Sequence, residues 1–406
     1  MKAPKLRFKA DDGNEFPEWT KVSFGSLIRE YVDKTKEENE DVLLSCAIEG
    51  VFLNSELFGH QRGESNVGYK KIQNNTLILS TQNLHLGNAN VNRRFIHGII
   101  SPAYKTYHVV GCLSEFMAIW VKRPAAKRFF YEATTVGASQ CRRNVVWDEL
   151  YAQTLSLPSL PEQQKIASFL YTIDEIIQST ESELTAWQER KKGVMQKIFN
   201  REVRFKADDG SEFPEWEEKR LGEVTSRVTR RNNNMISDIP LTISGVYGLI
   251  DQRKYFNKIV AASDLSNYYL LKNGEFAYNR SSSVGYDFGA IKRLDSCEYG
   301  AVSTLYVCFS ILDENDVCSD YLRVYFDSNI WNKYAASVCA EGARNHGLLN
   351  ISVNDFFDMP VYIPSLPEQK RIAECLSALD EVITLTKKEL SAWKEFKKGL
   401  LQQMFV

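Results

Sequence analysis

Residues 7–19 read RFKADDGNEFPEW and residues 204–216 read RFKADDGSEFPEW, so 12 of 13 positions are identical at an offset of 197. A second match joins residues 158–199 to residues 364–405, where 23 of 42 positions are identical at an offset of 206. Such self-similarity indicates an internal repeat. Each half of the chain therefore has a nearly invariant opening segment, a long variable block and a nearly invariant closing segment. Two repeats complete the pattern, which suggests a pseudo-two-fold arrangement.

The closing segments predict long helices that begin at Ser159 and Ser365, where an S-x-x-E sequence predicts a capping box. Apolar residues recur at alternating spacings of four and three, which is typical of a coiled-coil seam. A helix of about 37 residues would be roughly 55 Å long. The predicted seam residues are Ile166, Leu170, Ile173, Ile177, Leu184, Trp187, Ile372, Leu376, Leu379, Ile383, Leu390 and Trp393.

Two arrangements of these helices fit the pattern. They can pair with each other, antiparallel if the pseudo-two-fold axis crosses the helix direction, or each can lie on its own domain as a separate amphipathic helix. Polar residues interrupt the seam at Thr180 and Lys191 and at their copies in the second half, and such residues usually set register. Gly193 and Gly399 indicate either close approach of another backbone or frayed helix ends.

The variable blocks, residues 20–157 and 217–363, mix short β-rich runs with turns and two helical stretches, and they show little similarity to each other. Their pattern predicts an α+β class with two globular domains. The predicted domain limits are residues 1–157 for the first domain, 158–200 for the central helix, 201–363 for the second domain and 364–406 for the C-terminal helix.

Each variable block carries polar, Gly-rich loops that could present side chains to DNA, because Arg, Asn and Gln form paired hydrogen bonds with guanine and adenine edges. Taken singly, each loop is more often a solvated turn; their recurrence in two dissimilar blocks favours a function. The candidate DNA-binding residues are Arg93, Arg94, Tyr104, Lys105, Gln140, Arg142, Arg143, Tyr278, Asn279, Arg280, Ser281, Lys292, Arg344, Asn345 and His346.

The composition sets limits on the class of protein. The 406 residues carry a net charge of −2 and are 44% hydrophobic, which excludes a disordered chain. Neither an apolar stretch long enough to span a membrane nor a secretory signal is seen, so we expect a cytoplasmic protein without a membrane partner. Residues 20–150 have a net charge of +3 and residues 217–356 one of −2, so neither block is strongly basic.

The sequence contains no motif that predicts catalysis. A Walker A loop, a G-x-G-x-x-G sequence and the N-P-P-aromatic motif of amino-group methyltransferases are all missing. The 8 cysteines form no C-x-x-C pair and the 5 histidines no H-E-x-x-H pattern, so we expect no metal site. These gaps favour a binding or organising protein over an enzyme.

Two unlike domains joined by two like helices, with D-D-G-x-E-F-P-E-W opening each half and L-P-S-L-P-E-Q-x-x-I-A opening each helix, resemble the specificity subunit of a type I restriction-modification system. The resemblance covers the whole chain. It implies two target-recognition domains, each reading one half of a split sequence in double-stranded DNA, and conserved helices at residues 158–199 and 364–405.

The resemblance also implies partners. Two modification subunits would bind S-adenosylmethionine and methylate adenine, and restriction subunits would use ATP and Mg²⁺ to translocate and cut DNA. The chain itself would bind no cofactor and would have no catalytic residue. Its helices would hold the two readers apart. The alternative from the residues alone is a coiled-coil scaffold whose domains bind proteins rather than DNA.

Overall fold

The computed structural model describes residues 4–58, 65–139, 142–245, 247–255, 264–283, 285–339, 349 and 351–405. The chain divides into two compact units: unit 1 is Met1–Glu181 with Glu389–Val406, and unit 2 is Ser182–Lys388. Each unit therefore contains one variable domain and one half of each long helix. Among the described residues, every helix is too short or too polar to cross a membrane.

Unit 1 contains the first variable domain, and its elements follow in chain order. They are β1 (Thr20–Ser23), η1 (Phe24–Leu27), β2 (Ile28–Tyr31), β3 (Leu44–Cys46), β4 (Val51–Leu53), α1 (Asn54–Leu57), β5 (Lys70–Gln73), β6 (Leu77–Ser80), η2 (Leu84–Leu86), β7 (Ala89–Val91), β8 (His97–Ile100), β9 (Tyr104–Val109), α2 (Ser114–Trp120), α3 (Pro124–Glu132), β10 (Thr134–Ser139), β11 (Arg142–Val145), α4 (Trp147–Ala152) and β12 (Thr154–Leu157). The long helix α5 (Leu160–Phe199) follows and continues into unit 2.

Unit 2 contains the second variable domain. Its elements are β13 (Glu217–Arg220), α6 (Leu221–Val224), β14 (Thr225–Val228), η3 (Asn233–Met235), β15 (Leu241–Ser244), β16 (Gly248–Asp251), α7 (Gln252–Tyr255), β17 (Tyr269–Lys272), β18 (Phe276–Asn279), β19 (Ala290–Arg293), β20 (Tyr299–Val302), β21 (Val307–Ile311), α8 (Ser319–Asp327), α9 (Asn332–Val338), α10 (Val353–Phe357) and β22 (Pro360–Ile363). The long helix α11 (Leu366–Gln403) then returns to unit 1.

The two variable domains share one topology although their sequences are dissimilar. The four-stranded sheet of the first has the order β2-β9-β6-β7, and that of the second has the order β14-β21-β18-β19. The smaller pairs β1-β12, β3-β4 and β5-β8 recur as β13-β22, β15-β16 and β17-β20. The α+β class with two domains and two long helices is therefore confirmed, and the repeat extends to segments where the sequence shows none.

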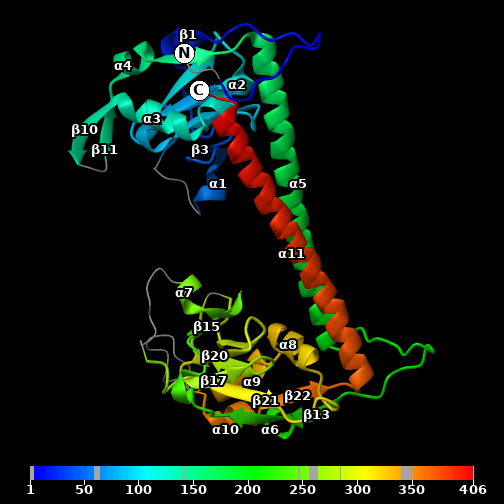
Figure 1. The fold of residues 1–406 in the computed structure, drawn as a ribbon. Helices are drawn as coiled ribbons and strands as arrows, with labels where there is room; N and C mark the ends of the chain where they lie inside the picture. Colours follow the sequence, from blue (N-terminus) through cyan, green and yellow to red (C-terminus); the bar gives the residue numbers. More distant parts are fainter. Residues whose placement is uncertain are drawn as a thin grey trace. The chain divides into compact units, whose positions relative to one another are not determined.

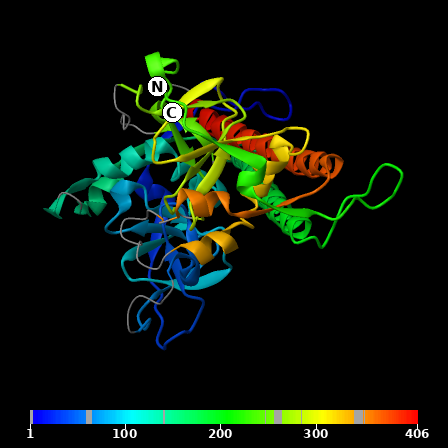
Figure 2. The same cartoon turned by 90° about the horizontal axis from the view of Figure 1, so that it is seen from below.

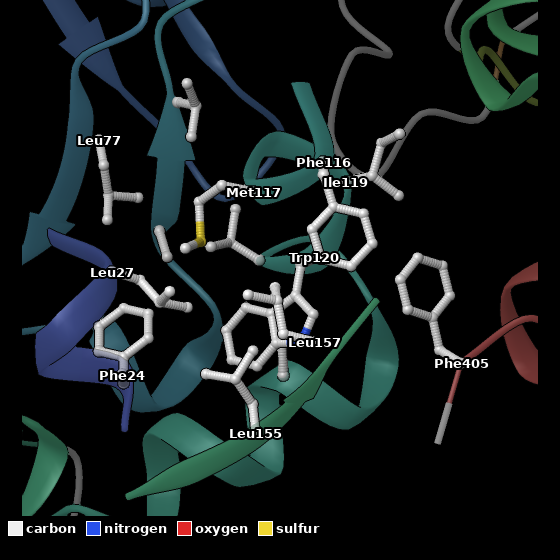
Figure 3. Close-up of a cluster of buried hydrophobic side chains, with 14 of the residues drawn as sticks. Phe24, Leu27, Leu77, Phe116, Met117, Ile119, Trp120, Leu155, Leu157 and Phe405 are labelled. Carbon is white, nitrogen blue, oxygen red and sulfur yellow. The ribbon is translucent and has the colours of Figure 1, made fainter. Parts of the chain in front are cut away.

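The core of unit 1 lies between its four-stranded sheet and the short helices. Phe24, Phe116 and Trp120 are almost fully buried, and the rings of Phe24 and Trp120 stack at 5.9 Å between centroids. Phe405, two residues after the end of α11, points into the same cluster, where its ring lies 5.7 Å from that of Phe116 (Figure 3). The end of the chain is thus part of the first domain's core.

Halves of the two long helices pack side by side within each unit (Figure 1). In unit 1 the N-terminal part of α5, with Ile166 and Leu170, shares a buried cluster with Leu400 of α11 and with Met404, which follows that helix. In unit 2 the C-terminal end of α5 and the N-terminal part of α11, with Ile372, share the equivalent cluster. The helices therefore pair antiparallel, and the alternative of two separate amphipathic helices is wrong.

The predicted seam residues of both helices are all buried or half-buried. The polar residues among them are satisfied locally. Thr180 donates to the carbonyl of Ile176, one helical turn earlier. Lys191 bonds Asp380 on the facing helix at 2.5 Å, and Lys397 pairs with Asp174. Residues 191 and 174 correspond to residues 397 and 380 at the offset of 206, so the same interhelical ion pair recurs in both units.

The opening segment of unit 1 is fixed to the start of α5 by a buried carboxylate. Glu162 has no exposed surface. It accepts two bonds from the Arg7 guanidinium, at 3.0 and 2.8 Å, and one from the indole N–H of Trp19 at 3.1 Å. Arg7 also donates to the carbonyl of Pro17 at 2.8 Å. Arg7, Trp19 and Glu162 thus form one Arg–Glu–Trp lock that joins residues distant in sequence.

Unit 2 contains the same lock. Glu368 is fully buried and accepts bonds from Arg204 at 3.1 and 2.9 Å and from the Trp216 indole at 3.1 Å. The predicted capping boxes are therefore wrong, because the glutamates bond to the opening segments. The hydroxyls of Ser159 and Ser365 are buried without a hydrogen-bond partner among the described residues. The predicted helix starts are nevertheless correct, since α5 and α11 begin one residue later.

The next residue of the repeated P-E-Q sequence joins each helix to its own domain. The Gln163 side chain accepts from the Leu113 backbone N–H at 2.9 Å and donates to the Pro158 carbonyl at 2.8 Å. In unit 2, Gln369 accepts from Cys318 N–H at 2.7 Å. Leu113 and Cys318 directly precede α2 and α8. One glutamine per unit therefore holds a domain helix at the start of the long helix.

The two ends of the chain reproduce the junction between the repeats. The backbone N–H of Leu6 donates to the Gln403 carbonyl at 3.0 Å. At the equivalent place in unit 2, Val203 N–H donates to Lys197 carbonyl at 3.3 Å within the continuous chain. The N- and C-terminal segments lie close together in both views (Figures 1 and 2). The same backbone hydrogen bond therefore occurs at both places.

Gly193 and Gly399 lie inside the long helices, where no described atom would come within 4 Å of an added Cβ. The proposed close approach of another backbone is therefore wrong. Both glycines are helical rather than at a frayed end, so the chain itself supplies no packing reason for them.

Replacing Glu162 by Gln should lower the free energy of unfolding by about 3 kcal/mol, because Arg7 loses the anion that compensates its partial burial. Glu368→Gln should have the same effect in unit 2. Urea denaturation followed by tryptophan fluorescence measures the change. Glu175→Gln, at an exposed position of α5, is the control and should change stability by less than about 0.5 kcal/mol. Equal midpoints for Glu162→Gln and the control would contradict the role of the lock.

Candidate nucleic-acid interface

Some of the predicted DNA-binding residues of the two domains lie at the same end of equivalent sheets. In the first domain, β6 ends at Ser80 opposite Tyr104, the first residue of β9. In the second, β18 ends at Asn279, and Arg280 follows it. Since β6 and β18 are equivalent strands, Tyr104, Lys105, Asn279, Arg280 and Ser281 occupy corresponding edges. The sequence could not show this, because the blocks do not align.

Arg93 and Arg94 are both half-exposed and paired within the chain. Arg93 lies 2.8 Å from Glu115, and its guanidinium stands 5.8 Å from the centre of the Tyr171 ring. Arg94 makes two bonds to Glu56, at 2.8 and 2.6 Å. Exposed ion pairs of this kind contribute little to stability and exchange readily. Both guanidiniums therefore remain accessible to a phosphate or a base edge.

Tyr104 and Lys105 begin β9 and have partners on neighbouring elements. The Tyr104 hydroxyl donates to the Cys46 carbonyl at 2.9 Å. The Lys105 ammonium bonds Glu30 at 2.8 Å and lies 4.5 Å from the centre of the Trp147 ring. Tyr104 thus supports the loop after β3, and only Lys105 carries a charge that a ligand could compete for.

Arg143 is anchored on the β10–β11 hairpin. It donates to the hydroxyl and the carbonyl of Thr134, both at 2.7 Å, and stacks 4.1 Å from the centre of the Tyr131 ring. Arg142 is the first residue of β11, but its side chain lies outside the described residues, as do Gln140 and, in the second domain, Arg344, Asn345 and His346.

Tyr278 does not belong to an interface. Its side chain is fully buried, its ring stacks on Phe356 at 4.8 Å between centroids, and its hydroxyl donates to the Phe288 carbonyl at 2.8 Å. Burial raises the pKa of this hydroxyl well above its usual value. The prediction that Tyr278 contacts DNA is wrong, because the period-2 alternation of β18 turns this residue toward the core.

The remaining candidates of the second domain are largely held by backbone groups or acids. Arg280 donates to the carbonyls of Ile351 and Leu305, at 3.1 and 3.3 Å. The Asn279 side chain accepts from the backbone N–H of Ser281 at 3.1 Å, which shapes the turn after β18. Lys292 on β19 bonds Asp327 at 2.6 Å. The structure thus gives these side chains fixed positions but does not gather them into one cluster.

A cavity of about 490 Å³ lies within unit 2 between the helix pair and the domain, and no sequence motif predicted it. Arg323 of α8 crosses this region, bonding Ser377 at 2.9 Å and lying 3.9 Å from Asp380 on α11. The charged side chains lining the cavity are Lys191, Lys192, Lys292, Arg293, Arg323, Asp295, Asp327 and Asp380. The excess of cations makes the cavity a candidate contact for phosphate.

The described residues contain no group of three or more His, Cys, Asp or Glu side chains that could hold a metal ion. The described cysteines are unpaired thiols. Burial raises the pKa of the Cys46 thiol to about 12, so this sulfur stays protonated at neutral pH.

Tyr278→Phe should lower the free energy of unfolding by about 1 kcal/mol in the absence of any ligand, because one buried hydrogen bond is lost. Urea denaturation of the full chain measures the effect. Tyr131→Phe is the matched control, since Tyr131 is half-exposed and its ring can still stack on Arg143. If Tyr278→Phe were as stable as the control, the core assignment of this hydroxyl would fail.

Comparison with known proteins supports one family. The family model described as "Type I restriction modification DNA specificity domain" matches residues 214–393. The MjaVIII specificity subunit of a type I restriction enzyme from Methanocaldococcus jannaschii is 27% identical over 266 residues, which are 61% of this chain and 60% of that protein. A putative MjaX specificity subunit from the same organism is 24% identical over 402 residues, 91% of this chain and 80% of that protein.

Solved structures share the fold over nearly the full length. The S subunit of a type I restriction-modification system from M. genitalium has a TM-score of 0.57 at 14% identity and covers 100% of this chain and 99% of its own. A chain from a structural study of complex assembly in the type I system has a TM-score of 0.55 at 14% identity, covering 97% and 99%. The matched sequences and the shared fold therefore make this chain similar to type I restriction-modification specificity subunits.

Proposed function

We propose that this chain reads a bipartite sequence in double-stranded DNA, one half-site with each variable domain, and that it holds two modification subunits in place. The chain is proposed to supply sequence discrimination without catalysis. The modification subunits would bring S-adenosylmethionine and methylate adenine. Restriction subunits, joined through them, would bring ATP and Mg²⁺.

The observation that carries this proposal is the pairing of one shared topology with two dissimilar sequences. The domains have the same strand order, and each is fixed to a long helix by the same Arg–Glu–Trp lock. The shared strand order and repeated helix contacts would let both domains bind identical partner subunits. The variable loops at corresponding ends of the sheets would let each domain read a different base sequence. A single-function domain duplicated for stability would have no need of unlike loops.

We further propose that the helix pair sets the distance between the half-sites. The helix α5 has 40 residues, which corresponds to about 60 Å at 1.5 Å per residue. That length exceeds one DNA turn of about 34 Å, so unread base pairs would separate the half-sites. Linking two weak readers makes the second contact intramolecular, which raises affinity without a larger interface.

A protein-binding scaffold is the second candidate, and one observation favours it. Among the predicted interface cations whose side chains the structure describes, most have acidic partners within the chain, as Arg94 has Glu56 and Lys292 has Asp327. If the chain reads DNA, many of the electrostatic contacts to DNA phosphates must come from the modification subunits. The two candidates therefore differ in what the assembled complex does with DNA.

The test is a gel shift of the chain, alone and assembled with its modification subunits, on a random-sequence DNA pool at stated salt. We expect sequence-specific binding by the complex and poor binding by the chain alone. Replacing residues 217–363 with the equivalent block of another specificity subunit should change one half-site of the methylated sequence. Binding without base preference would favour the scaffold, and a change in both half-sites would refute separate readers.

The spacer proposal has its own test. One heptad is inserted between Ser182 and Glu183 and another between Lys388 and Glu389, positions that preserve both interhelical ion pairs. Seven residues add about 10 Å, so we expect a spacer about three base pairs longer with both half-sites unchanged. Mapping methylated adenines across a genome gives the result. An unchanged spacer in an active complex would contradict the helix pair as the determinant of distance.

A further inference from the structure

Unit 2 contains a further cavity, of about 560 Å³, at the C-terminal end of α5. Its lining residues come from residues 199–201, from the segment 325–337 that includes most of α9, and from β22. These three segments are described throughout. Small-molecule sites in proteins usually measure about 300–1,000 Å³, so the volume suits a compact ligand. We call this space the α5-end cavity.

Aromatic rings form much of the lining of the α5-end cavity. They belong to Phe199, Tyr325, Trp331, Tyr334 and Tyr362. Tyr325 and Trp331 are only 2% and 3% exposed, and the Trp331 indole N–H donates to the Phe326 carbonyl at 3.1 Å. Tyr334 is half-buried, and its hydroxyl donates to the Asp355 carbonyl at 2.9 Å. These rings are therefore held in place without a ligand.

The charges around the α5-end cavity are of one sign. Arg201 and Lys333 line it, and its described lining includes neither Asp nor Glu. Both cations are exposed, and neither forms an ion pair with a described residue. The Arg201 guanidinium lies 5.1 Å from the centre of the Tyr362 ring. In the cavity of about 490 Å³, by contrast, aspartates accompany the cations. The α5-end cavity therefore favours an anionic ligand.

The backbone of Arg201 is also unusual. Its φ angle is 62°, in the left-handed region. The Arg201 N–H donates to the Ile198 carbonyl and the Glu202 N–H to the Lys197 carbonyl, both at 2.9 Å, which forms a Schellman motif at the end of α5. Glycine is usual at this position, because a side chain makes the left-handed conformation unfavourable. Such strain is concentrated at functional sites.

We propose that the α5-end cavity binds a nucleoside phosphate. The base would stack on the Tyr334 and Tyr362 rings, since every base has a π-face that aromatic side chains can hold. Arg201 and Lys333 would hold the phosphate through charge-assisted hydrogen bonds. A purely apolar ligand would not need the cations, and a bare phosphate would not need the rings. This site uses none of the residues assigned to DNA reading, so it is independent of the proposed function.

The test is isothermal titration calorimetry of the full-length chain with AMP at fixed ionic strength. Adenosine and inorganic phosphate serve as the two partial ligands. We expect AMP to bind more tightly than either by about tenfold or more, because each partial ligand lacks one set of contacts. A single-stranded oligonucleotide separates the two sources of a nucleoside phosphate. Binding of AMP would assign the site to a free nucleotide, and binding of the oligonucleotide alone would assign it to a nucleic-acid strand.

Arg201→Gly is the sharpest variant, because it removes the cation and also relieves the left-handed backbone. We expect the affinity for AMP to fall about tenfold while the thermal unfolding temperature stays the same or rises. A loss of binding in this variant could then not be attributed to unfolding. Lys197→Ala is the matched control, since Lys197 is an exposed cation in the last turn of α5 but does not line the cavity. It should bind AMP like the wild type.

Stacking is tested at Tyr334. Tyr334→Leu keeps an apolar side chain but removes the ring, so the affinity for AMP should fall about tenfold. Tyr334→Phe keeps the ring and should bind like the wild type. Both variants lose the hydroxyl that bonds the Asp355 carbonyl, so a difference between them reports on stacking rather than on that hydrogen bond.

Three results would overturn the proposal. AMP and the oligonucleotide could bind no better than inorganic phosphate, adenosine could bind as tightly as AMP, or Arg201→Gly and Lys197→Ala could weaken binding equally. The last result would mean attraction to the general charge of the helix end. None of these results would affect the proposed reading of DNA, because the gel shift and the block exchange test other residues.

Discussion

The buried carboxylate at the start of each long helix is the constraint on which the rest of the molecule depends. A buried charged group must be paired. Glu162 is paired by Arg7 and Trp19, which lie more than 140 positions away in the sequence. This contact brings β1 beside β12, which directly precedes the helix. The same requirement at Glu368 closes the second domain. In each unit the opening segment of the domain is therefore held against the start of the long helix by its contact with the buried glutamate.

The constancy of these contacts explains why the domain interiors can vary. The lock, the glutamine after it and the interhelical ion pairs all involve repeated residues. The two sheets share their strand order, but their side chains can differ between the two domains. The loops of the two domains can then differ while the repeated segments stay the same. This division of constant frame and variable loop agrees with the proposed reading of a different half-site by each domain.

Prediction from the sequence succeeded for features that depend on the residues of a single helix or strand. The period of 3.5 gave the helices and their seam, because apolar spacing along a helix maps directly onto one face. Prediction from the sequence failed where a side chain makes its contact with a residue far away in the sequence. The capping boxes were wrong because Arg7 and Arg204 take the glutamates. The prediction for Tyr278 was wrong because its ring packs on Phe356, which lies on another element.

The sequence by itself determined the repeat, the two long helices, the α+β class and the resemblance to one family, since these depend on periodicity and on motifs read along the chain. Only the tertiary structure decided that the two variable domains share a topology and that Leu6 and Gln403 make the same contact as Val203 and Lys197 at the junction of the halves. Those features arise from hydrogen bonds and packing between residues far apart in sequence, which no local pattern records.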